Sequence, residues 1–368
     1  MSAEEDYGLS RQTALREIPV PELSYKPRNP RHYNPPIGLI GCGGIAHQHL
    51  AAYKKAGFNV VALCDLAESR AVALRDKFYP EAEVFTDCGG LLGRAGIEVV
   101  DVATHPHQRL AILEEALDAG KHVLSQKPFV LDLDVGERLV EKADRRGVRL
   151  AVNQNGRWAP HFSYMRHAIQ AGVIGDVASV SFTLNWDHTW IAGTEFEKIH
   201  HIILYDFAIH WFDIATMFFP ERKARRVFAA ASRVSGQTIK PPLIAKALVE
   251  FDGGLANFSF NGLSPYGQSD RTTIIGARGT LQSVGADLSN QQVTLFTAEG
   301  FCKPELEGSW FPDGFHGTMA ELLCAVEEGR EPTNSARNNL KSLALAFAAM
   351  ASADSGEPKV PGEVRRLG

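Results

Sequence analysis

A glycine-rich turn between a predicted strand and a predicted helix constrains the fold of this 368-residue chain more than any other feature. The apolar run Ile37–Ile40 ends at Gly41, and the six residues from Gly41 to Ala46 read G-C-G-G-I-A, the G-x-G-x-x-A spacing. The first glycine of this spacing allows a tight turn, the second lets a pyrophosphate approach the backbone, and a small last residue lets the helix pack on the strand. The helix that begins here also presents unpaired N–H groups to an anion. The segment therefore predicts a dinucleotide-binding unit.

Strands and helices alternate from this turn to about residue 155. We expect strands at Ile37–Ile40, Val60–Cys64, Val99–Ala103, His122–Leu124 and Arg149–Val152. We expect helices at about 45–56, 67–78, 107–119 and 132–146. Because parallel strands need crossover helices, this order predicts a parallel, doubly wound sheet with right-handed connections.

The pattern changes beyond residue 155. Helical patterns occur at 161–171, 203–219, 315–328 and 336–353. Strand candidates lie at 177–186, 226–232, 245–251, 255–260, 272–275, 280–284 and 292–297. Successive strands joined by turns such as Asp252-Gly253-Gly254 indicate antiparallel pairing. The predicted fold is an α/β N-terminal Rossmann domain, residues 37–155, plus an α+β C-terminal domain, residues 156–368, with a large, mainly antiparallel open sheet.

Residues 1–36 are expected to form a proline-rich arm rather than a domain. Prolines recur from Pro19 to Pro36 without a sustained apolar period, which favours an extended conformation. Two outcomes fit this pattern: the arm is disordered, or it lies along a neighbouring subunit.

Composition narrows the classes of function. A formal net charge of −5 favours neither nucleic acid nor an anionic membrane as a partner. No apolar run is long enough to span a bilayer, and the acidic N-terminus lacks an apolar signal segment. The five cysteines show no C-x-x-C spacing, which argues against a disulfide framework and for a reducing, cytoplasmic setting.

An acidic residue at the end of the second predicted strand bears on the cofactor. Asp65 follows Cys64 near the spacing expected for a carboxylate that binds the adenosine ribose hydroxyls. A carboxylate there repels a 2′-phosphate, so NAD is expected rather than NADP, although Arg70 nearby favours the opposite choice.

A lysine–proline pair is the first candidate for catalysis. The predicted strand His122–Leu124 leads to Lys127-Pro128, where the proline forces the chain to leave the sheet. Ligands of doubly wound sheets bind at the carboxyl ends of the strands. Lys127 is therefore a candidate catalytic group, although an isolated lysine at such a place is more often a solvated surface residue.

The second candidate is the helical stretch Tyr205–Asp213. Asp206 and His210 are spaced i and i+4, so they share a helix face, and Asp213 lies next to that face. Carboxylates beside a histidine set its tautomer, which suits a general base. The alternative is a histidine satisfied within the core, but an idle Asp–His pair on such an aromatic helix would be costly.

Other histidines raise the question of a metal. They occur at His105, His107, His161, His167, His188, His200, His201 and His316. They are spread over several predicted elements and no H-E-x-x-H motif is present, so no metal site is expected.

Further segments complete a family pattern. They are Cys64-Asp65, Thr104-His105-Pro106, Ala116–Pro128, Arg157-Trp158-Ala159-Pro160, Gly172–Gly175, and Asp206, His210 and Asp213 in a D-x-x-x-H-x-x-D arrangement. With the glycine-rich turn, they resemble the glucose–fructose oxidoreductase/inositol dehydrogenase/rhizopine-catabolism (Gfo/Idh/MocA) oxidoreductase family from Ile37 to the C-terminus. The chain departs from the family at Gln126, where a glutamate is usual, at Arg109, where a histidine is common, and at His105, where a proline is common.

The resemblance implies an NAD(P)-dependent dehydrogenase that acts on a secondary hydroxyl of a sugar, glycoside or cyclitol, for example at C3. His210, oriented by Asp206, would be the general base, and Lys127 would stabilise alkoxide character, or the two roles would be exchanged. Cofactor contacts are expected at Gly41, Gly43, Gly44, Ile45, Ala46, Asp65, Thr104, His105, Gln126 and Lys127. Sugar contacts are expected at Arg157, Trp186, Asp187, His188 and Tyr205, because sugars need aromatic faces and polar groups.

Two other functions fit the same motifs. One is an NAD-retaining glycosidase or self-recycling oxidoreductase that uses transient oxidation, and the other is a non-catalytic nicotinamide-binding regulator. A regulator would not need both Lys127 and His210. An antiparallel sheet with an uncovered face would also favour a homodimer or homotetramer.

Overall fold

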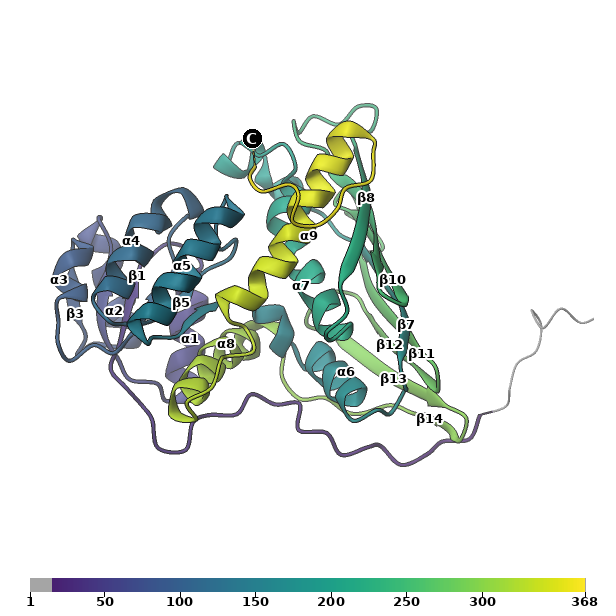
Figure 1. Ribbon diagram of the computed structural model, residues 1–368, viewed down its shortest axis with the longest axis horizontal. Helices are drawn as coiled ribbons and strands as arrows, with labels where there is room; N and C mark the ends of the chain where they lie inside the picture. The colour runs from purple at the N-terminus through teal and green to yellow at the C-terminus, as the bar shows by residue number, and fades with distance from the viewer. Residues whose placement is uncertain (1–14, 368) are drawn as a thin grey trace, which may run out of the picture.

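The computed structural model describes residues 15–367, and its N-terminal part contains a six-stranded parallel sheet (Figure 1). The strands are β1 Ile37–Ile40, β2 Val60–Cys64, β3 Glu83–Phe85, β4 Val99–Val102, β5 His122–Ser125 and β6 Leu150–Val152, in the order β3-β2-β1-β4-β5-β6. Every neighbouring pair is parallel. The strand order reverses between β1 and β4, and such a reversal places the ligand crevice at the carboxyl ends of these strands.

Five helices alternate with these strands. They are α1 Ala46–Ala56, α2 Glu68–Phe78, α3 Cys88–Leu92, α4 Pro106–Asp118 and α5 Leu133–Arg146. The predicted α/β class with a parallel sheet is confirmed. Strand β3 and helix α3 were not predicted, because β3 has only three residues and α3 contains two glycines, which disfavour helix.

Eight strands form the second sheet, in the order β14-β13-β12-β11-β7-β10-β9-β8. They are β7 Val177–Asn185, β8 Ala224–Ser232, β9 Ile244–Phe251, β10 Gly254–Asn261, β11 Ser269–Gly276, β12 Gly279–Gly285, β13 Gln291–Thr297 and β14 Gly300–Cys302. Only β7 and β10 pair in parallel among these described strands, and the other pairs are antiparallel. The predicted large, mainly antiparallel open sheet is confirmed.

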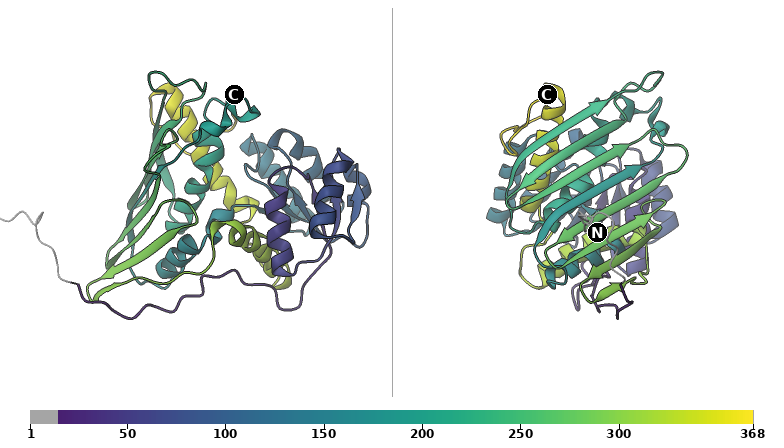
Figure 2. Two further views of the ribbon diagram at one scale, coloured as in Figure 1. Left: turned by 180° about the vertical axis from the view of Figure 1, so that it is seen from behind. Right: turned by 90° about the vertical axis from the view of Figure 1, so that its right-hand side faces the viewer.

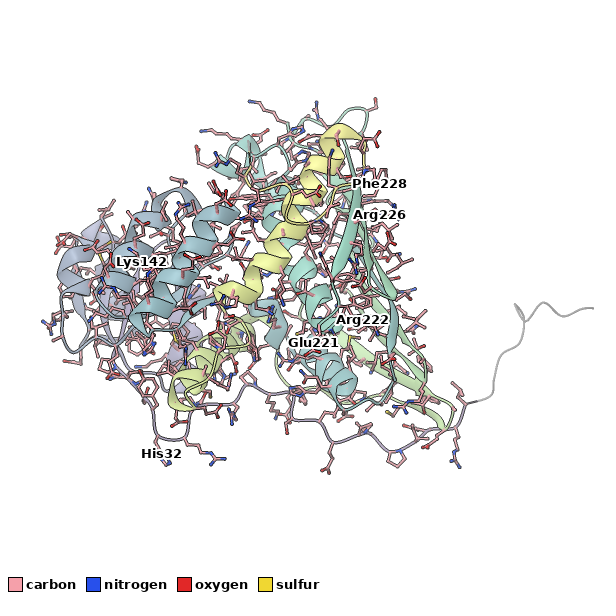
Figure 3. The ribbon with its side chains drawn as sticks, in the orientation of Figure 1. His32, Lys142, Glu221, Arg222, Arg226 and Phe228 are labelled. Atoms are coloured by element: carbon pink, nitrogen blue, oxygen red, sulfur yellow. The ribbon has the colours of Figure 1, made fainter. Side chains whose placement is uncertain are left out.

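One face of the second sheet carries helices and the other is open (Figure 2). Alternation along the strands places five apolar side chains opposite the buried ones, each between 43% and 48% exposed: Phe228, Leu248, Leu255, Ile275 and Val284. Phe228, labelled in Figure 3, pairs across the strands with Leu248. The open face is therefore more apolar than a sheet face that meets only water.

A helical layer lies between the two sheets. It contains α6 Pro160–Gln170, α7 Ile209–Phe218, α8 Trp310–Glu327 and α9 Ala336–Ser355, with short 3-10 turns at Asn155–Trp158, Thr189–Ile191 and Glu195–Lys198. The expected helix at 203–219 is divided: Ile203–Phe207 form a π-helical turn, and α7 follows it. No helix between residues 15 and 367 is both long and apolar enough to cross a membrane.

The described part of the N-terminal arm, residues 15–36, runs extended along the surface of its own chain, with His32 marking its course in Figure 3. The Ile18 N–H donates to the Phe301 carbonyl at 2.9 Å, beside β14. Farther along, the Glu327 carboxylate accepts the N–H groups of residues 31–33. This contact with its own chain was not among the two expected outcomes, and residues 1–14 of the predicted arm lie outside the described residues.

Candidate active site

Lys127 lies where the chain leaves β5, and the peptide bond between Lys127 and Pro128 is cis. Its Nζ donates to the carbonyl oxygen of Asp206 at 2.8 Å and to Asp206 Oδ1 at 2.9 Å. Asp206 belongs to the π-helical turn, so this pair joins the edge of the parallel sheet to the C-terminal half of the chain. The two side chains are 17% and 29% exposed, which leaves the pair accessible to a ligand.

His210 on α7 is near enough to Lys127 to feel its charge, but it does not pair with Asp206. Within the described residues, its buried Nδ1 has no hydrogen-bond partner. The expectation that Asp206 orients His210 was wrong, because hydrogen bonds of a π-helical turn span five residues and the i, i+4 alignment no longer holds. Burial, with a further effect from the Lys127 charge, holds the pKa of His210 well below its usual range. The ring is therefore neutral at pH 7.

Arg157 and Asp213 form a buried ion pair beside the site. Arg157 Nε lies 2.5 Å from Asp213 Oδ2, and Arg157 Nη2 lies 2.7 Å from Asp213 Oδ1. Arg157 also donates to the Thr333 carbonyl and to Asn338 Oδ1, each at 2.6 Å. These bonds engage the guanidinium and hold α7 to the start of α9. The structure thus corrects the expected role of Arg157: it is a structural residue rather than a sugar contact.

Two of the expected sugar contacts lie beside the Lys127–Asp206 pair. His188 is buried, and its Nδ1 accepts a hydrogen bond of 3.0 Å from Trp186 Nε1. Trp186 stacks on Phe207, with 4.1 Å between ring centroids. Burial lowers the pKa of His188 to about 4, while the charges of Asp206 and Lys127 act on it in opposite directions. A neutral imidazole and an aromatic face are therefore available here.

The other two expected sugar contacts, Tyr205 and Asp187, differ in their surroundings. Burial raises the pKa of Tyr205 to about 12, with a further increase from Asp206 and an opposing effect of Arg109. The Tyr205 hydroxyl therefore keeps its proton near neutral pH. Asp187 Oδ1 instead accepts hydrogen bonds from the N–H and Oγ1 of Thr189, at 2.9 and 2.6 Å, and so turns toward its own loop.

The glycine-rich turn has the shape that a dinucleotide requires. Gly41 has a φ of +97°, and a Cβ there would lie 2.9 Å from Thr104 Cγ2. A Cβ on Gly43 or Gly44 would meet no described atom within 4 Å, so the space above them is open. Ala46 is fully buried against the sheet. The residues present therefore fit a pyrophosphate at the start of α1.

Asp65 supports the turn as well as facing the crevice. Its Oδ2 accepts the Cys42 N–H at 2.8 Å, and its Oδ1 accepts the Ala67 N–H at 2.9 Å. These bonds hold the carboxylate at the end of β2. Thr104 and His105 follow β4, and His105 stacks on His107 at the start of α4. All the expected cofactor residues thus lie on the segments that follow β1, β2, β4 and β5.

A buried polar cluster that the sequence analysis did not predict lies behind this edge of the sheet. Asp101 Oδ2 lies 2.6 Å from His49 Nδ1 and accepts a hydrogen bond of 2.6 Å from the Tyr53 hydroxyl. All three residues have no exposed surface. The signal was available, because a charged residue inside the apolar strand V-V-D-V requires a partner in the core.

Gln126 connects this cluster to Lys127. Gln126 Nε2 lies 3.3 Å from His49 Nε2, and Asn153 Nδ2 lies 3.1 Å from the same atom. Gln126 Oε1 accepts the N–H of Lys127 at 2.7 Å. Because Nδ1 of His49 donates to Asp101, its Nε2 carries no proton and can accept. The side-chain amide groups of Gln126 and Asn153 both point their nitrogens at this acceptor. Gln126 therefore positions the backbone of Lys127.

Arg109 is a second positioning residue that the sequence analysis did not assign. It is 1% exposed and donates to the carbonyl oxygens of Thr104, Gln126 and Pro128. Burial lowers the pKa of Arg109 to about 10. One guanidinium thus holds the segments after β4 and β5 on both sides of Lys127.

The arrangement can bind an alcohol and move its proton, because an ammonium group, a neutral imidazole and a phenol hydroxyl converge on one edge of a nucleotide-binding sheet. In residues 15–367, the one group of side chains with metal-ligand geometry lies elsewhere, where the ligand atoms of His200, His201 and Asp354 lie within 4.8 Å of one another. His201 Nε2 and Asp354 Oδ1 already pair at 2.7 Å.

Comparisons with known proteins agree with this geometry. The family described as "Oxidoreductase family, NAD-binding Rossmann fold" matches residues 36–154, and the "GFO/IDH/MocA C-terminal domain" matches residues 162–282. D-apiose dehydrogenase from Paraburkholderia graminis is 29% identical over 86% of this chain and 87% of its own length. Inositol 2-dehydrogenase from Rhizobium meliloti is 26% identical over 86% of this chain and 96% of its own length.

One solved structure with the same fold is an oxidoreductase from Agrobacterium radiobacter in complex with NAD+, L-tartaric acid and magnesium. It matches with a TM-score of 0.80 at 23% identity, over 89% of this chain and 99% of the other. At this identity the likeness establishes the shared two-part architecture.

Proposed function

The chain belongs to the Gfo/Idh/MocA oxidoreductase family, and on this premise we propose that it transfers a hydride between a nicotinamide cofactor and a secondary hydroxyl of a sugar, glycoside or cyclitol. The observation that carries the proposal is the Lys127–Asp206 pair beside neutral His210, at the strand ends next to a turn that fits a dinucleotide. The similar proteins named D-apiose dehydrogenase and inositol 2-dehydrogenase support this class of substrate.

Different residues of the chain act on the reacting hydroxyl and on the ring of the substrate. When bound, the nicotinamide supplies the hydride acceptor for oxidation. The Lys127 ammonium, held by Asp206, donates to the reacting oxygen and stabilises its alkoxide character. His210, which is neutral, accepts the hydroxyl proton. Trp186, His188 and Tyr205 bind the ring of the sugar or cyclitol. Asp187 contacts the substrate only at the edge of the site.

The test is a panel of sugars, glycosides and cyclitols with NAD, with NADH absorbance as the readout. We expect Lys127→Ala and His210→Ala each to lower kcat by about 10²–10⁴-fold, the usual contribution of a positioned acid or base. NADH binding, followed by fluorescence, should be retained in both. Lys142→Ala is the control, because Lys142 lies on the surface of α5 and pairs with Asp118. Full activity of both site variants would refute the assignment.

We propose NAD as the preferred cofactor, because Asp65 places a carboxylate at the end of β2 that would repel a 2′-phosphate. Asp65→Asn removes the charge and leaves one oxygen, which can accept only one of the two N–H groups of Cys42 and Ala67, because the amide nitrogen is a donor. We expect the ratio of kcat/KM for NADP over NAD to rise about tenfold in this variant, equivalent to about 1.4 kcal/mol. An unchanged ratio would assign the preference to another residue.

We assign cofactor binding to residues 37–155, and substrate binding and assembly to residues 156–368. The alternative functions, an NAD-retaining glycosidase or self-recycling oxidoreductase and a non-catalytic regulator, gain no support from relatives that are named dehydrogenases. A cytoplasmic location is proposed from the five cysteines, which form no disulfide in the described chain.

We propose that a second copy of the chain covers the open face of the second sheet, in a homodimer or homotetramer. The exposed apolar row around Phe228 and Leu248 supports this, because water would otherwise contact it. Phe228→Glu should yield a smaller particle by light scattering. Leu110→Glu, which changes an exposed apolar residue on α4, is the control and should not alter the assembly. An unchanged mass for Phe228→Glu would exclude this face.

A further inference from the structure

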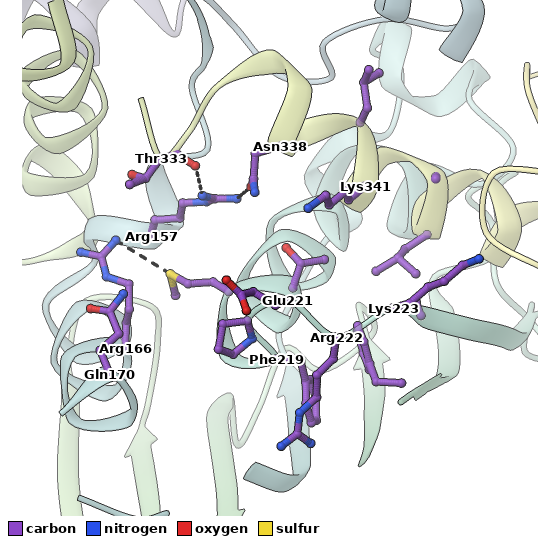
Figure 4. A pocket seen from close by; sticks show the side chains of 18 of the residues that line it. Arg157, Arg166, Gln170, Phe219, Glu221, Arg222, Lys223, Thr333, Asn338 and Lys341 are labelled. Carbon is purple, nitrogen blue, oxygen red and sulfur yellow. Dashed lines mark hydrogen bonds between the residues drawn. The ribbon is translucent and has the colours of Figure 1, made fainter. Parts of the chain in front are cut away.

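A large cavity lies apart from the proposed active site. Its volume is about 1130 Å³, it opens to solvent, and it is lined by residues of the N-terminal arm, α5, α6, α7, α8, α9, the segment before β8 and the C-terminal residues 361–365 (Figure 4). Of the described residues that line it, none is Lys127, Asp206 or His210. Thr216 and Met217 of α7 face the cavity, so this helix separates it from the proposed active site. The cavity therefore needs an explanation of its own.

The lining of this cavity is strongly cationic, with eight lysines and arginines against three glutamates. Four of these cations have carboxylate partners: Lys26, Arg28, Arg157 and Arg365. Within residues 15–367 the other four form no ion pair, and one of them, Arg222, donates to the carbonyl oxygens of Val177 and Gly253. Arg222 is thus held by backbone oxygens. The charges of Arg166, Lys223 and Lys341 are not balanced by a carboxylate partner in the described chain, and they attract anions into the cavity.

Arg166 has the environment of an anion-binding residue. It is partly buried on α6, with its guanidinium carbon 5.5 Å from the centre of the Trp158 ring. Its Nη2 donates to Ser163 Oγ at 3.2 Å and lies 3.5 Å from His167 Nε2, and its Nη1 reaches only the Met217 sulfur at 3.9 Å, a weak acceptor. Burial lowers the pKa of Arg166 to about 10, and the nearby charge of Arg157 adds to this. An anion would supply the acceptors that the guanidinium fork lacks.

The rest of the cavity suits the body of an organic molecule. Figure 4 shows Arg157 and Arg166 at one end and the ring of Phe219 farther along the wall, and Met217 also lines the cavity. Glu221 adopts a φ of +62°, the one positive φ of a non-glycine residue in the described chain. Such backbone strain is concentrated at ligand sites, where surrounding structure maintains it. Glu221 also places a negative charge near these cations. This charge would weaken the binding of an anion that interacts with the cavity through its charge alone.

We propose that this cavity binds a small organic anion, with a phosphate or carboxylate group on Arg166 and an apolar or ring-shaped body along Trp158 and Met217. The site is a second ligand site, distinct from the hydroxyl-oxidising site. Arg157 connects the two physically, because it lines the cavity and holds Asp213 on the helix that carries His210. The proposal does not depend on the oxidoreductase activity.

The experiment measures ligand-induced thermal stabilisation with sodium phosphate and sodium citrate as probes, at ionic strength held constant with sodium chloride. We expect a saturable rise in Tm of about 2 °C or more for wild type, as for a ligand that binds only the folded chain. Saturation with phosphate alone would identify a phosphate ligand, and saturation with citrate alone a carboxylate. A rise that follows ionic strength rather than either probe would overturn the proposal.

Variants locate the binding. Because phosphate can also bind at the glycine-rich turn, the decisive quantity is the difference in Tm rise between wild type and Arg166→Gln, each compared with itself without ligand. We expect Arg166→Gln to lose most of the rise, and Lys341→Gln, on the exposed wall, to raise the half-saturating concentration. Arg145→Gln on α5 is the control and should behave as wild type. Equal rises in wild type and both cavity variants would refute the site, whatever the activity assays show.

Discussion

The two histidine–carboxylate arrangements of this chain differ in almost every physical respect. His49 and Asp101 are 52 positions apart in sequence, yet they lie 2.6 Å apart with no exposed surface, and the ring has partners on both sides. His210 and Asp206 are four positions apart, yet Asp206 binds Lys127. Among the described residues, Nδ1 of His210 has no partner. The His49 ring is thus bonded at both nitrogens inside the core, although Asp101 Oδ1 is buried without a partner among the described residues, whereas His210 keeps capacity for a ligand.

The difference shows how stability and reactivity are separated in this molecule. A fully buried carboxylate must be satisfied inside the protein, because an unpaired charge there costs several kcal/mol. A partly exposed ion pair such as Lys127–Asp206 contributes little to stability, since water screens it. Substitutions in the first cluster should therefore change folding, and those in the second should change turnover.

The largest effect should come from Asp101→Leu. This change leaves His49 Nδ1 and the Tyr53 hydroxyl buried without their acceptor. We expect the free energy of unfolding to fall by about 2–6 kcal/mol, because each of these two buried donors costs about 1–3 kcal/mol without an acceptor. Urea unfolding followed by circular dichroism measures it. Tyr53→Phe, which removes one hydrogen bond, should cost only about 1 kcal/mol. A loss below that value for Asp101→Leu would show that the cluster is not essential for folding.

Asp206→Asn should show the opposite behaviour. We expect the free energy of unfolding to change by less than about 1 kcal/mol, because the pair is partly exposed. We expect kcat to fall by about 10²-fold, since the Lys127 ammonium would lose the carboxylate charge that holds it and keep only neutral oxygen acceptors. Steady-state kinetics and urea unfolding of the same preparation test both statements. Wild-type kcat in this variant would mean that Lys127 does not depend on Asp206.

Gln126→Glu tests the link between the two arrangements. A carboxylate at this position would face the acceptor nitrogen of His49, so the folded cluster would have to take up a proton. The folded state would then bind more protons than the unfolded chain, and the free energy of unfolding would fall as pH rises. We expect a loss of about 1–3 kcal/mol at pH 8, and less at pH 6.

Gln126→Met is the matched control for this prediction. It removes the same hydrogen bonds without adding a charge, so its loss of stability should not depend on pH. If Gln126→Glu and Gln126→Met show the same loss at both pH values, the neutral amide has no special role.

The smallest effect concerns pH. The pKa of His210 lies well below its usual range because of burial and the Lys127 charge, so the ring stays neutral as pH falls below 6.5. We expect kcat to change less than about twofold between pH 8 and 6, whereas a histidine with an ordinary pKa near 6.5 would lose about fourfold of its neutral form. A pH–rate profile of wild type at saturating substrate tests this. A fourfold decrease would show that bound substrate restores an ordinary environment to the ring.

Much of the fold could be predicted because it depends on local patterns. β1 and β2 were predicted residue for residue, and four of the five described helices beside the parallel sheet, α1, α2, α4 and α5, to within one residue at each end. In such segments apolar residues recur at a regular spacing and turn residues mark the ends, so a single sequence reveals them. The π-helical turn at Ile203–Phe207 could not be predicted this way, because an α-helix of the same residues shows the same apolar spacing.

The sequence by itself determined the parallel sheet, the glycine-rich turn and the placement of Lys127 at a strand end, since each follows from neighbours along the chain. Only the tertiary structure decided which charged groups pair. It joined Asp206 to Lys127 rather than to His210, Arg157 to Asp213 rather than to a substrate, and Asp101 to His49. The physical reason is that an ion pair depends on the distance between two atoms, and here those atoms come from segments that the folded chain brings together.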